Sequence, residues 1–139
     1  MALLTGSNKI KTAVFISGTG SNLKSLIQFS KLKKSPIVIE MIISNNAKSK
    51  GLQYAKVYKI KKKVFDFKNN SSEKKVIDEL KKNNINLICL AGFMKILSKN
   101  FIKSFKGQIL NIHPSLLPKY KGLNTHEKAI KNKDKYSGC

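Results

Sequence analysis

The sequence contains no arginine, although it is strongly basic. All 28 basic residues among its 139 are lysine, and with seven acidic residues they give a formal net charge of +21. Such a charge suggests a nucleic-acid or acidic-membrane partner, but bidentate recognition of phosphates and guanines favours arginine. Because the lysines are spread along the whole chain, we expect no specific nucleic-acid binding, only weak and salt-sensitive attraction to polyanions.

Cysteine is also scarce, and long apolar runs are missing. Cys89 and Cys139 are the only cysteines, and their spacing matches neither a C-x-x-C pair nor a metal site, which excludes a disulfide framework. No apolar run approaches membrane-spanning length, and residues 1–4 are too short for a signal peptide. We therefore expect a cytoplasmic protein without a metal and without a membrane partner.

What the sequence does contain is an alternation of apolar runs and helical patterns. With 41% hydrophobic residues, it suits one domain over residues 1–139, preceded by a loose leader over residues 1–11. We expect strands over residues 12–17, 37–43, 64–67, 87–91 and 109–112, separated by helices. The predicted fold class is α/β, an open, mostly parallel sheet with helices on both faces and ligands beyond the carboxyl ends of the strands.

Two weaker local signals lie between the second and fourth of these strands. The lysine cluster over residues 59–63 is expected to be solvated. Asn70 and Glu73 have the spacing of a capping box, which predicts that a helix begins there.

A glycine turn follows the first predicted strand. Gly18 and Gly20 permit a tight turn, and the N–H groups of Gly20, Ser21 and Asn22 at the start of a helix would bind an anion such as phosphate. Leu23 stands where the dinucleotide motif needs its third glycine, which disfavours NAD. The alternative is that Ser21 or Asn22 simply caps the helix.

Asn111 and His113 end the last predicted strand. They are two residues apart, so in an extended backbone they share one face, while Leu110 and Ile112 face the core. Pro114 restricts the backbone of His113. A positioned imidazole can act as an acid or base, and the amide can donate to a carbonyl oxygen that gains charge. The alternative is a proline-rich turn with a buried, hydrogen-bonded histidine.

Residues 16–23, 90–97 and 110–120 resemble the motifs of the phosphoribosylglycinamide formyltransferase family in order and spacing. The resemblance implies a Rossmann-like formyltransferase fold and transfer of a formyl group from 10-formyltetrahydrofolate, the co-substrate, to the amine of 5-phosphoribosylglycinamide in purine biosynthesis. The last motif is shared by the wider formyltransferase group, so two alternatives stay open. These are a formyltetrahydrofolate hydrolase and an inactive, truncated ribonucleotide-binding domain.

The resemblance also implies roles for individual residues. Asn111 and His113 would be catalytic, and the phosphate would be bound by Gly20, Ser21 and Asn22. Asn124 stands where the family carries a histidine, and His126 is expected to be structural. The folate would be bound by Lys68, Met94, Lys95, Ile96, Leu97 and Asn111.

The resemblance stops at Cys139, ahead of the aspartate that the family uses in catalysis. The sequence resembles the front two-thirds of the family, so we expect a C-terminally truncated fold that binds the ribonucleotide weakly. We do not expect turnover by these 139 residues at an ordinary rate. An uncovered sheet edge would also offer a pairing surface to a second copy of the chain, so a homo-oligomer stays among the expectations.

Overall fold

The computed structural model describes residues 9–139, in which strands and helices alternate. The elements are β1 (Ile10–Ile16), α1 (Ser21–Ser30), β2 (Ile37–Ser44), the 3-10 turn η1 (Lys50–Leu52), α2 (Gln53–Tyr58), β3 (Lys61–Val64), α3 (Asn70–Lys82), β4 (Leu87–Leu90), α4 (Lys99–Ser104), β5 (Gln108–Asn111) and α5 (Thr125–Lys131). The predicted α/β class is confirmed.

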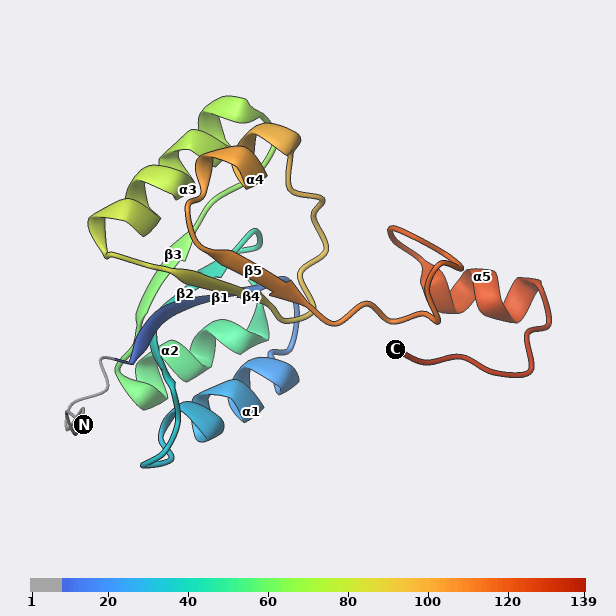
Figure 1. The fold of residues 1–139 in the computed structure, drawn as a ribbon, viewed down its shortest axis with the longest axis horizontal. Coiled ribbons are helices and arrows are strands. Elements are labelled where there is room, and N and C mark those ends of the chain that lie inside the picture. The colour runs from blue at the N-terminus through green and yellow to red at the C-terminus, as the bar shows by residue number, and fades with distance from the viewer. Residues whose placement is uncertain (1–8) are drawn as a thin grey trace, which may run out of the picture.

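The five strands form one parallel sheet in the order β3-β2-β1-β4-β5. Helices α1 and α2 cover one face and α3 and α4 the other, while α5 lies beyond the carboxyl end of β5 (Figure 1). The chain leaves β1 toward β2 and later returns to β4 on the opposite side of β1. At such a reversal of strand order the loops diverge, and ligands of open parallel sheets bind there.

The two faces of the sheet bury separate apolar clusters. Leu23 and Ile27 of α1 pack on one face, and both are fully buried. On the other face Phe15 is fully buried, with its ring centroid 5.7 Å from that of Phe67 and 5.4 Å from that of Phe93. Each such side chain stabilises the fold by about 1.5–3 kcal/mol relative to exposure. Phe93 therefore ties the segment after β4 to the core.

The first strand begins earlier than predicted. Ile10 pairs with Ile37, and its N–H donates to the carbonyl of Pro36 at 2.8 Å. The leader predicted for residues 1–11 is therefore too long, because Ile10 and Lys11 find partners in β2 that the polar sequence around them did not suggest. The first eight residues of the predicted leader lie outside the described residues.

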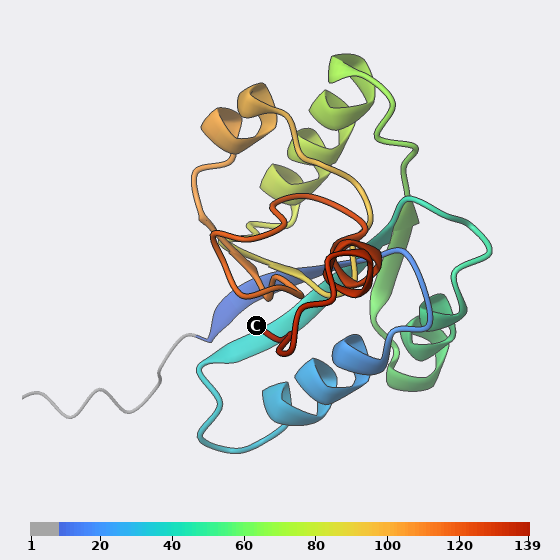
Figure 2. The same ribbon diagram turned by 90° about the vertical axis from the view of Figure 1, so that its right-hand side faces the viewer.

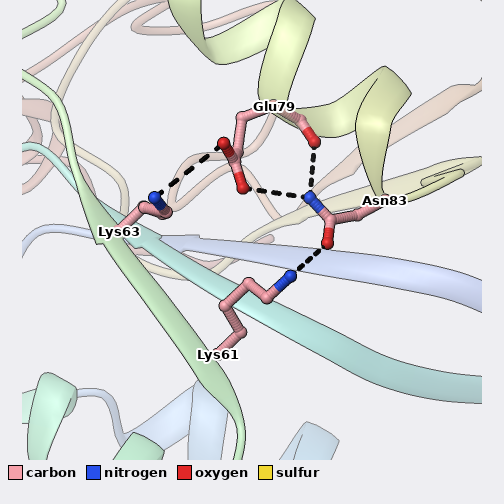
Figure 3. Close-up of polar contacts among 4 residues, drawn as sticks. All are labelled: Lys61, Lys63, Glu79 and Asn83. Atoms are coloured by element: carbon pink, nitrogen blue, oxygen red, sulfur yellow. Dashed lines mark hydrogen bonds and ion pairs between the residues drawn. The ribbon is translucent and has the colours of Figure 1, made fainter.

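An edge strand is present near the predicted place, but β3 is formed by the lysine cluster and ends at Val64, so the bounds predicted as residues 64–67 are wrong. Lys61 pairs with Met41 and Val64 with Ser44, after which the chain turns away and buries Phe67. Lys61 and Lys63 point toward α3, where they contact Asn83 and Glu79 (Figure 3). Lysines on an edge strand discourage pairing with another chain.

Helix α3 lies where the sequence predicts a helix, but its capping box is formed by other residues. Its N-cap is Asn69, whose side chain accepts from the N–H of Ser72 at 2.9 Å, so the capping box does not involve Asn70 and Glu73. Glu73 is 6% exposed and accepts hydrogen bonds from the N–H, at 3.0 Å, and the hydroxyl of Ser98. The carboxylate therefore joins α3 to the start of α4.

Candidate active site

A cleft of about 710 Å³ lies beyond the carboxyl ends of β4 and β5, next to the start of α1. A volume of this size suits a small-molecule ligand. Residues after β5 lie in front of this end of the sheet, as the end-on view shows (Figure 2). The cleft is lined by Asn22, Leu90, residues 92–96, residues 111–114, residues 122–127, Gly138 and Cys139. Three of the predicted motifs therefore meet in one cleft.

The predicted phosphate loop leads into α1. Gly20 is the N-cap residue, in the left-handed conformation with φ 79°, and no side chain caps the helix. The alternative that Ser21 or Asn22 is a helix cap is therefore wrong. Ser21 and Asn22 are exposed, and the first turn carries no acidic residue, so its N–H groups are available to an anion. Of the three predicted residues, only Asn22 lines the cleft.

A second glycine holds this loop in place. A Cβ atom on Gly20 would lie 2.7 Å from the Cα of Gly51, so the two backbones need glycine at their closest approach. The carbonyl of Gly18 accepts from the N–H of Gly51 at 3.0 Å and from the hydroxyl of Ser49 at 2.6 Å. No local motif in the sequence marks Ser49 or Gly51 as part of this loop. The available signal was topological, since loops after neighbouring parallel strands lie side by side.

Ser17 joins three loops at the carboxyl end of the sheet. Its hydroxyl donates to Oδ1 of Asn45 at 2.5 Å and accepts from the N–H of Met94 at 2.7 Å. Ser17 follows β1, Asn45 follows β2 and Met94 follows β4. One hydroxyl thus links the predicted phosphate loop to the predicted folate segment, and no local motif in the sequence marks it.

The predicted folate-binding residues divide into two groups. Met94, Lys95 and Ile96 line the cleft, with Met94 60% and Ile96 76% exposed. Leu97 packs against the apolar cluster under α3 and α4 instead, and Lys68 lies in the exposed loop after β3; neither lines the cleft. The structure therefore brings the first three together and places the other two elsewhere.

Asn111 is the last residue of β5, and His113 follows just outside the strand. Both line the cleft. The prediction that Leu110 and Ile112 face the core is wrong, because they are 56% and 71% exposed. In this edge strand it is Ile109 that packs on the core. Only β4 pairs with β5 among the described residues, and no element of residues 9–139 buries the other face of β5.

His113 makes one hydrogen bond to the loop that follows it. Nε2 lies 2.9 Å from the carbonyl oxygen of Tyr120. The ring is half-buried and borders the cleft. The alternative of a hydrogen-bonded histidine in a proline-rich turn is right about the bond, but the ring is neither fully buried nor remote from the site.

The start of α5 closes the far side of the cleft. Asn124 is its N-cap in a left-handed conformation with φ 58°, and Asn124, His126 and Glu127 all line the cleft. His126 thus occupies the first helical turn, as predicted, and also borders the site. Within residues 9–139, no group of three or more histidine, cysteine, aspartate or glutamate side chains could hold a metal ion.

Known proteins resemble this chain over nearly its whole length. The family model described as formyl transferase matches residues 10–139. The chain belongs to the formyl transferase family. Phosphoribosylglycinamide formyltransferase from Haemophilus influenzae is 46% identical over 92% of this chain and 62% of its own length. The trifunctional purine biosynthetic protein adenosine-3 of Gallus gallus is 44% identical over 96% of this chain and 14% of its own length.

The fold of this family member matches as well. The crystal structure of phosphoribosylglycinamide formyltransferase from Anaplasma phagocytophilum superposes with a TM-score of 0.84 at 40% identity, over 94% of this chain and 62% of that one. The predicted family resemblance and the Rossmann-like formyltransferase fold are therefore confirmed. The chain spans about three fifths of the length of these single-activity relatives. No helix in the described part is long and apolar enough to cross a membrane.

Proposed function

We propose that this chain acts in formyl transfer from 10-formyltetrahydrofolate to the amine of 5-phosphoribosylglycinamide, in purine biosynthesis. The observation that carries the proposal is that one cleft collects Asn22, the residues Met94 to Ile96, and the pair Asn111 and His113. The names of the similar proteins support the same reaction. Since the chain covers only part of those proteins, the reaction and its substrates are inferences for this chain.

The ribonucleotide phosphate is proposed to bind at the start of α1. The helix is ten residues long, and the N–H groups of Gly20, Ser21 and Asn22 are not satisfied by a side-chain cap. The positive end of the helix dipole and these donors favour a phosphate. The backbone that carries these donors is held in place, because a Cβ atom on Gly20 would lie only 2.7 Å from the Cα of Gly51.

The folate is proposed to occupy the side of the cleft next to β4. Met94 and Ile96 offer apolar contacts for a ring system, and Lys95 offers an ammonium group for carboxylates. Asn111 would contact the formyl end of the same molecule. Lys68 can take part only if the folate extends beyond the cleft toward the start of α3, and Leu97 would support the segment from the core side.

When bound, the folate supplies a formyl carbon for attack by the ribonucleotide amine. The side-chain amide of Asn111 donates to the formyl oxygen, which gains negative charge as the new carbon–nitrogen bond forms. His113 accepts the proton that the amine loses and returns it to the folate nitrogen as its bond to carbon breaks. Written in this way, the reaction uses only the side chains of Asn111 and His113 and needs no metal ion.

The test measures formyl transfer and ribonucleotide affinity in this chain extended with the C-terminal third of a related enzyme, and in Asn111→Ala and His113→Ala of the same extended version. We expect each change to lower kcat about 10²–10³-fold, with the ribonucleotide Kd held within about threefold because the phosphate site is separate. Asn100→Ala is the matched control, since Asn100 is exposed on α4 and lies outside the cleft. Parent-like rates in both variants would contradict the assigned roles.

Two other results would favour one of the alternative functions. Formate release without the amine would identify a formyltetrahydrofolate hydrolase. Saturable ribonucleotide binding without turnover would identify a ribonucleotide-binding domain. Duplex DNA as a further ligand separates site binding from lysine-driven attraction, since only the latter fades steeply with salt.

The proposed substrates also indicate the location of the protein and its partners. We propose a cytoplasmic protein of one domain whose partners are these two small molecules, and whose net charge of +21 attracts the anionic substrates. One face of β5 is exposed, with Leu110 56% exposed. We therefore also propose that two copies of the chain can associate through this face. Analytical ultracentrifugation over a range of concentrations tests that point.

A further inference from the structure

Tyr120 holds an uncommon backbone conformation next to the catalytic histidine. Its φ is 54°, in the left-handed region that a bulky side chain rarely adopts. Such a residue keeps this conformation only where its surroundings hold it. The carbonyl of Tyr120 is the group that contacts Nε2 of His113 at 2.9 Å. What holds Tyr120 therefore also holds the imidazole.

Asp134, in the segment after α5, forms hydrogen bonds with this loop. Its Oδ2 accepts from the hydroxyl of Tyr120 at 2.7 Å, and its Oδ1 lies 3.0 Å from Nζ of Lys119. The aspartate side chain is only 15% exposed. The hydrogen bond from Tyr120, and after it the one from Lys119, hold the pKa of Asp134 below its ordinary value of 3.8. The carboxylate is therefore ionised at neutral pH. We call these three side chains the Asp134 clasp.

The clasp lies outside the cleft. Neither Lys119, Tyr120 nor Asp134 is among the residues that line it. Groups placed in this way do not contact a substrate in the cleft, so the clasp can affect a reaction there only by orienting His113.

The hydrogen bond to Tyr120 also decides which imidazole nitrogen carries the proton. A carbonyl oxygen has no proton to give, so Nε2 must be the donor. Neutral imidazole has one N–H, which leaves the lone pair on Nδ1. Within the part of the chain that the structure describes, Nδ1 makes no hydrogen bond to another residue. It is the nitrogen left to exchange a proton with a ligand.

We propose that Asp134 is a positioning residue that acts through Tyr120 to keep His113 in its Nε2–H form, so that Nδ1 is the base of the reaction. As the amine nitrogen bonds to the formyl carbon, its proton moves to the lone pair of Nδ1. The same proton leaves Nδ1 for the folate nitrogen when the bond from that nitrogen to the formyl carbon breaks, and Nε2 keeps its proton throughout. The role in catalysis rests on the proposed function, whereas the Nε2–H form does not.

The test is nitrogen-15 NMR of the imidazoles in the whole chain. The protein has only two histidines, so His126→Gln assigns the spectrum. We expect the parent protein to show Nδ1 without a proton and an Nε2–H protected from solvent. In Tyr120→Phe and Asp134→Asn we expect Nε2–H exchange about 5- to 10-fold faster and some of the Nδ1–H form. Asp134→Glu, which keeps the carboxylate, should restore part of the protection.

Tyr136→Phe is the matched control, because Tyr136 is 80% exposed and follows Asp134 closely. It should leave both nitrogens unchanged. Where the parent protein turns over, Tyr120→Phe should lower kcat about tenfold with KM within twofold, as for other supporting residues.

The proposal is overturned if Tyr120→Phe and Asp134→Asn keep the protected Nε2–H, or if Tyr136→Phe loosens it equally. Should Asp134→Asn fail to fold by circular dichroism, Tyr120→Phe decides alone, since it removes a single oxygen atom. A parent protein without turnover would count against the proposed function, and the NMR result would still decide the form of His113.

Discussion

The two polar ends of the cleft are built in different ways. The predicted phosphate loop after β1 is held by backbone contacts over the core, where Gly20 and Gly51 are both buried and their backbones touch. The loop that carries His113 follows an edge strand and is held by polar side chains, among them Tyr120 and Asp134. The first loop has one arrangement set by sterics, whereas the second depends on charged and polar groups near the surface.

This difference matches what each end is proposed to do. A phosphate is bound by N–H groups at fixed spacing, and sterics maintain such spacing without further support. A proton-transferring imidazole needs a defined tautomer and ring orientation, which hydrogen bonds supply. We infer that damage to the first loop lowers stability and binding together, while damage to the second lowers turnover first.

The largest effect should come from adding a methyl group to the predicted phosphate loop. Gly20→Ala places a Cβ atom 2.7 Å from the Cα of Gly51 at a backbone φ of 79°, which alanine rarely adopts. Overpacking and backbone strain together should lower the free energy of unfolding by about 2–4 kcal/mol. Because the N–H groups also move, ribonucleotide affinity should fall. Urea unfolding and titration calorimetry measure the two quantities.

Gly18→Ala is the control for this change. A Cβ atom there meets nothing within 4 Å, although Gly18 is only two residues away. We expect near-parent stability. If Gly18→Ala and Gly20→Ala proved equally harmful, the contact with Gly51 would not be what fixes the loop.

The second effect tests the bridge between the two ends of the cleft. Ser17→Ala removes the acceptor for the N–H of Met94 and the donor to Asn45. Leaving such groups without partners should lower the free energy of unfolding by about 1–3 kcal/mol. Folate affinity should fall more than ribonucleotide affinity, because Met94 moves more freely while Gly20 stays locked. Amide exchange at Met94 and separate titrations of the two ligands check this.

Ser71→Ala provides the comparison for Ser17→Ala, since Ser71 is exposed on α3. It should leave both affinities unchanged. An equal loss of both affinities in Ser17→Ala would mean that the hydroxyl supports the whole end of the sheet and not the Met94 segment.

The sequence predicted the central strands and the position of β5 well, and the bounds of β3 and the packing of β5 poorly. In β1 and β4 the apolar β-branched runs are buried on both faces, so composition alone marks them. In β3, Lys61 to Lys63 carry no apolar signal, and pairing with β2 decides the structure. Leu110 and Ile112 show the opposite error, because apolar residues on an edge strand were assumed to have a layer to pack against.

Which residues line the cleft was predictable where a single loop carries a local motif. The N–H groups around Gly20 and the pair Asn111 and His113 follow from local motifs, and the strand order brings them together. Contacts between loops from different strands were not predictable, since they depend on distances that no local pattern records. Ser17 with Met94, and Tyr120 with Asp134, are of this kind.

The smallest effect concerns pH and the Asp134 clasp. The hydrogen bond with Asp134 raises the pKa of Lys119 above its ordinary value of 10.5 and that of Tyr120 above 10.0, while the bonds to Tyr120 and Lys119 lower the pKa of Asp134 below 3.8. A lowered aspartate pKa stabilises the fold above 3.8, and this contribution is lost as pH falls through the folded-state value. The raised pKa values stabilise below about pH 10, and that contribution is lost as pH rises through the folded-state values.

The clasp should therefore stabilise the protein over a plateau from about pH 5 to about pH 9, with losses on both sides. Asp134→Asn should lower the thermal midpoint on this plateau, by less than Ser17→Ala does, and the difference from the parent protein should shrink in acid. Asp78→Asn removes an exposed ion pair with Lys74, at 3.0 Å, and should change the midpoint little at any pH, because exposed pairs contribute little. If the thermal midpoints of the parent protein and Asp134→Asn fell in parallel as the pH is lowered, the aspartate would not hold the histidine loop by its charge. The second end of the cleft would then be fixed, like the first, by packing.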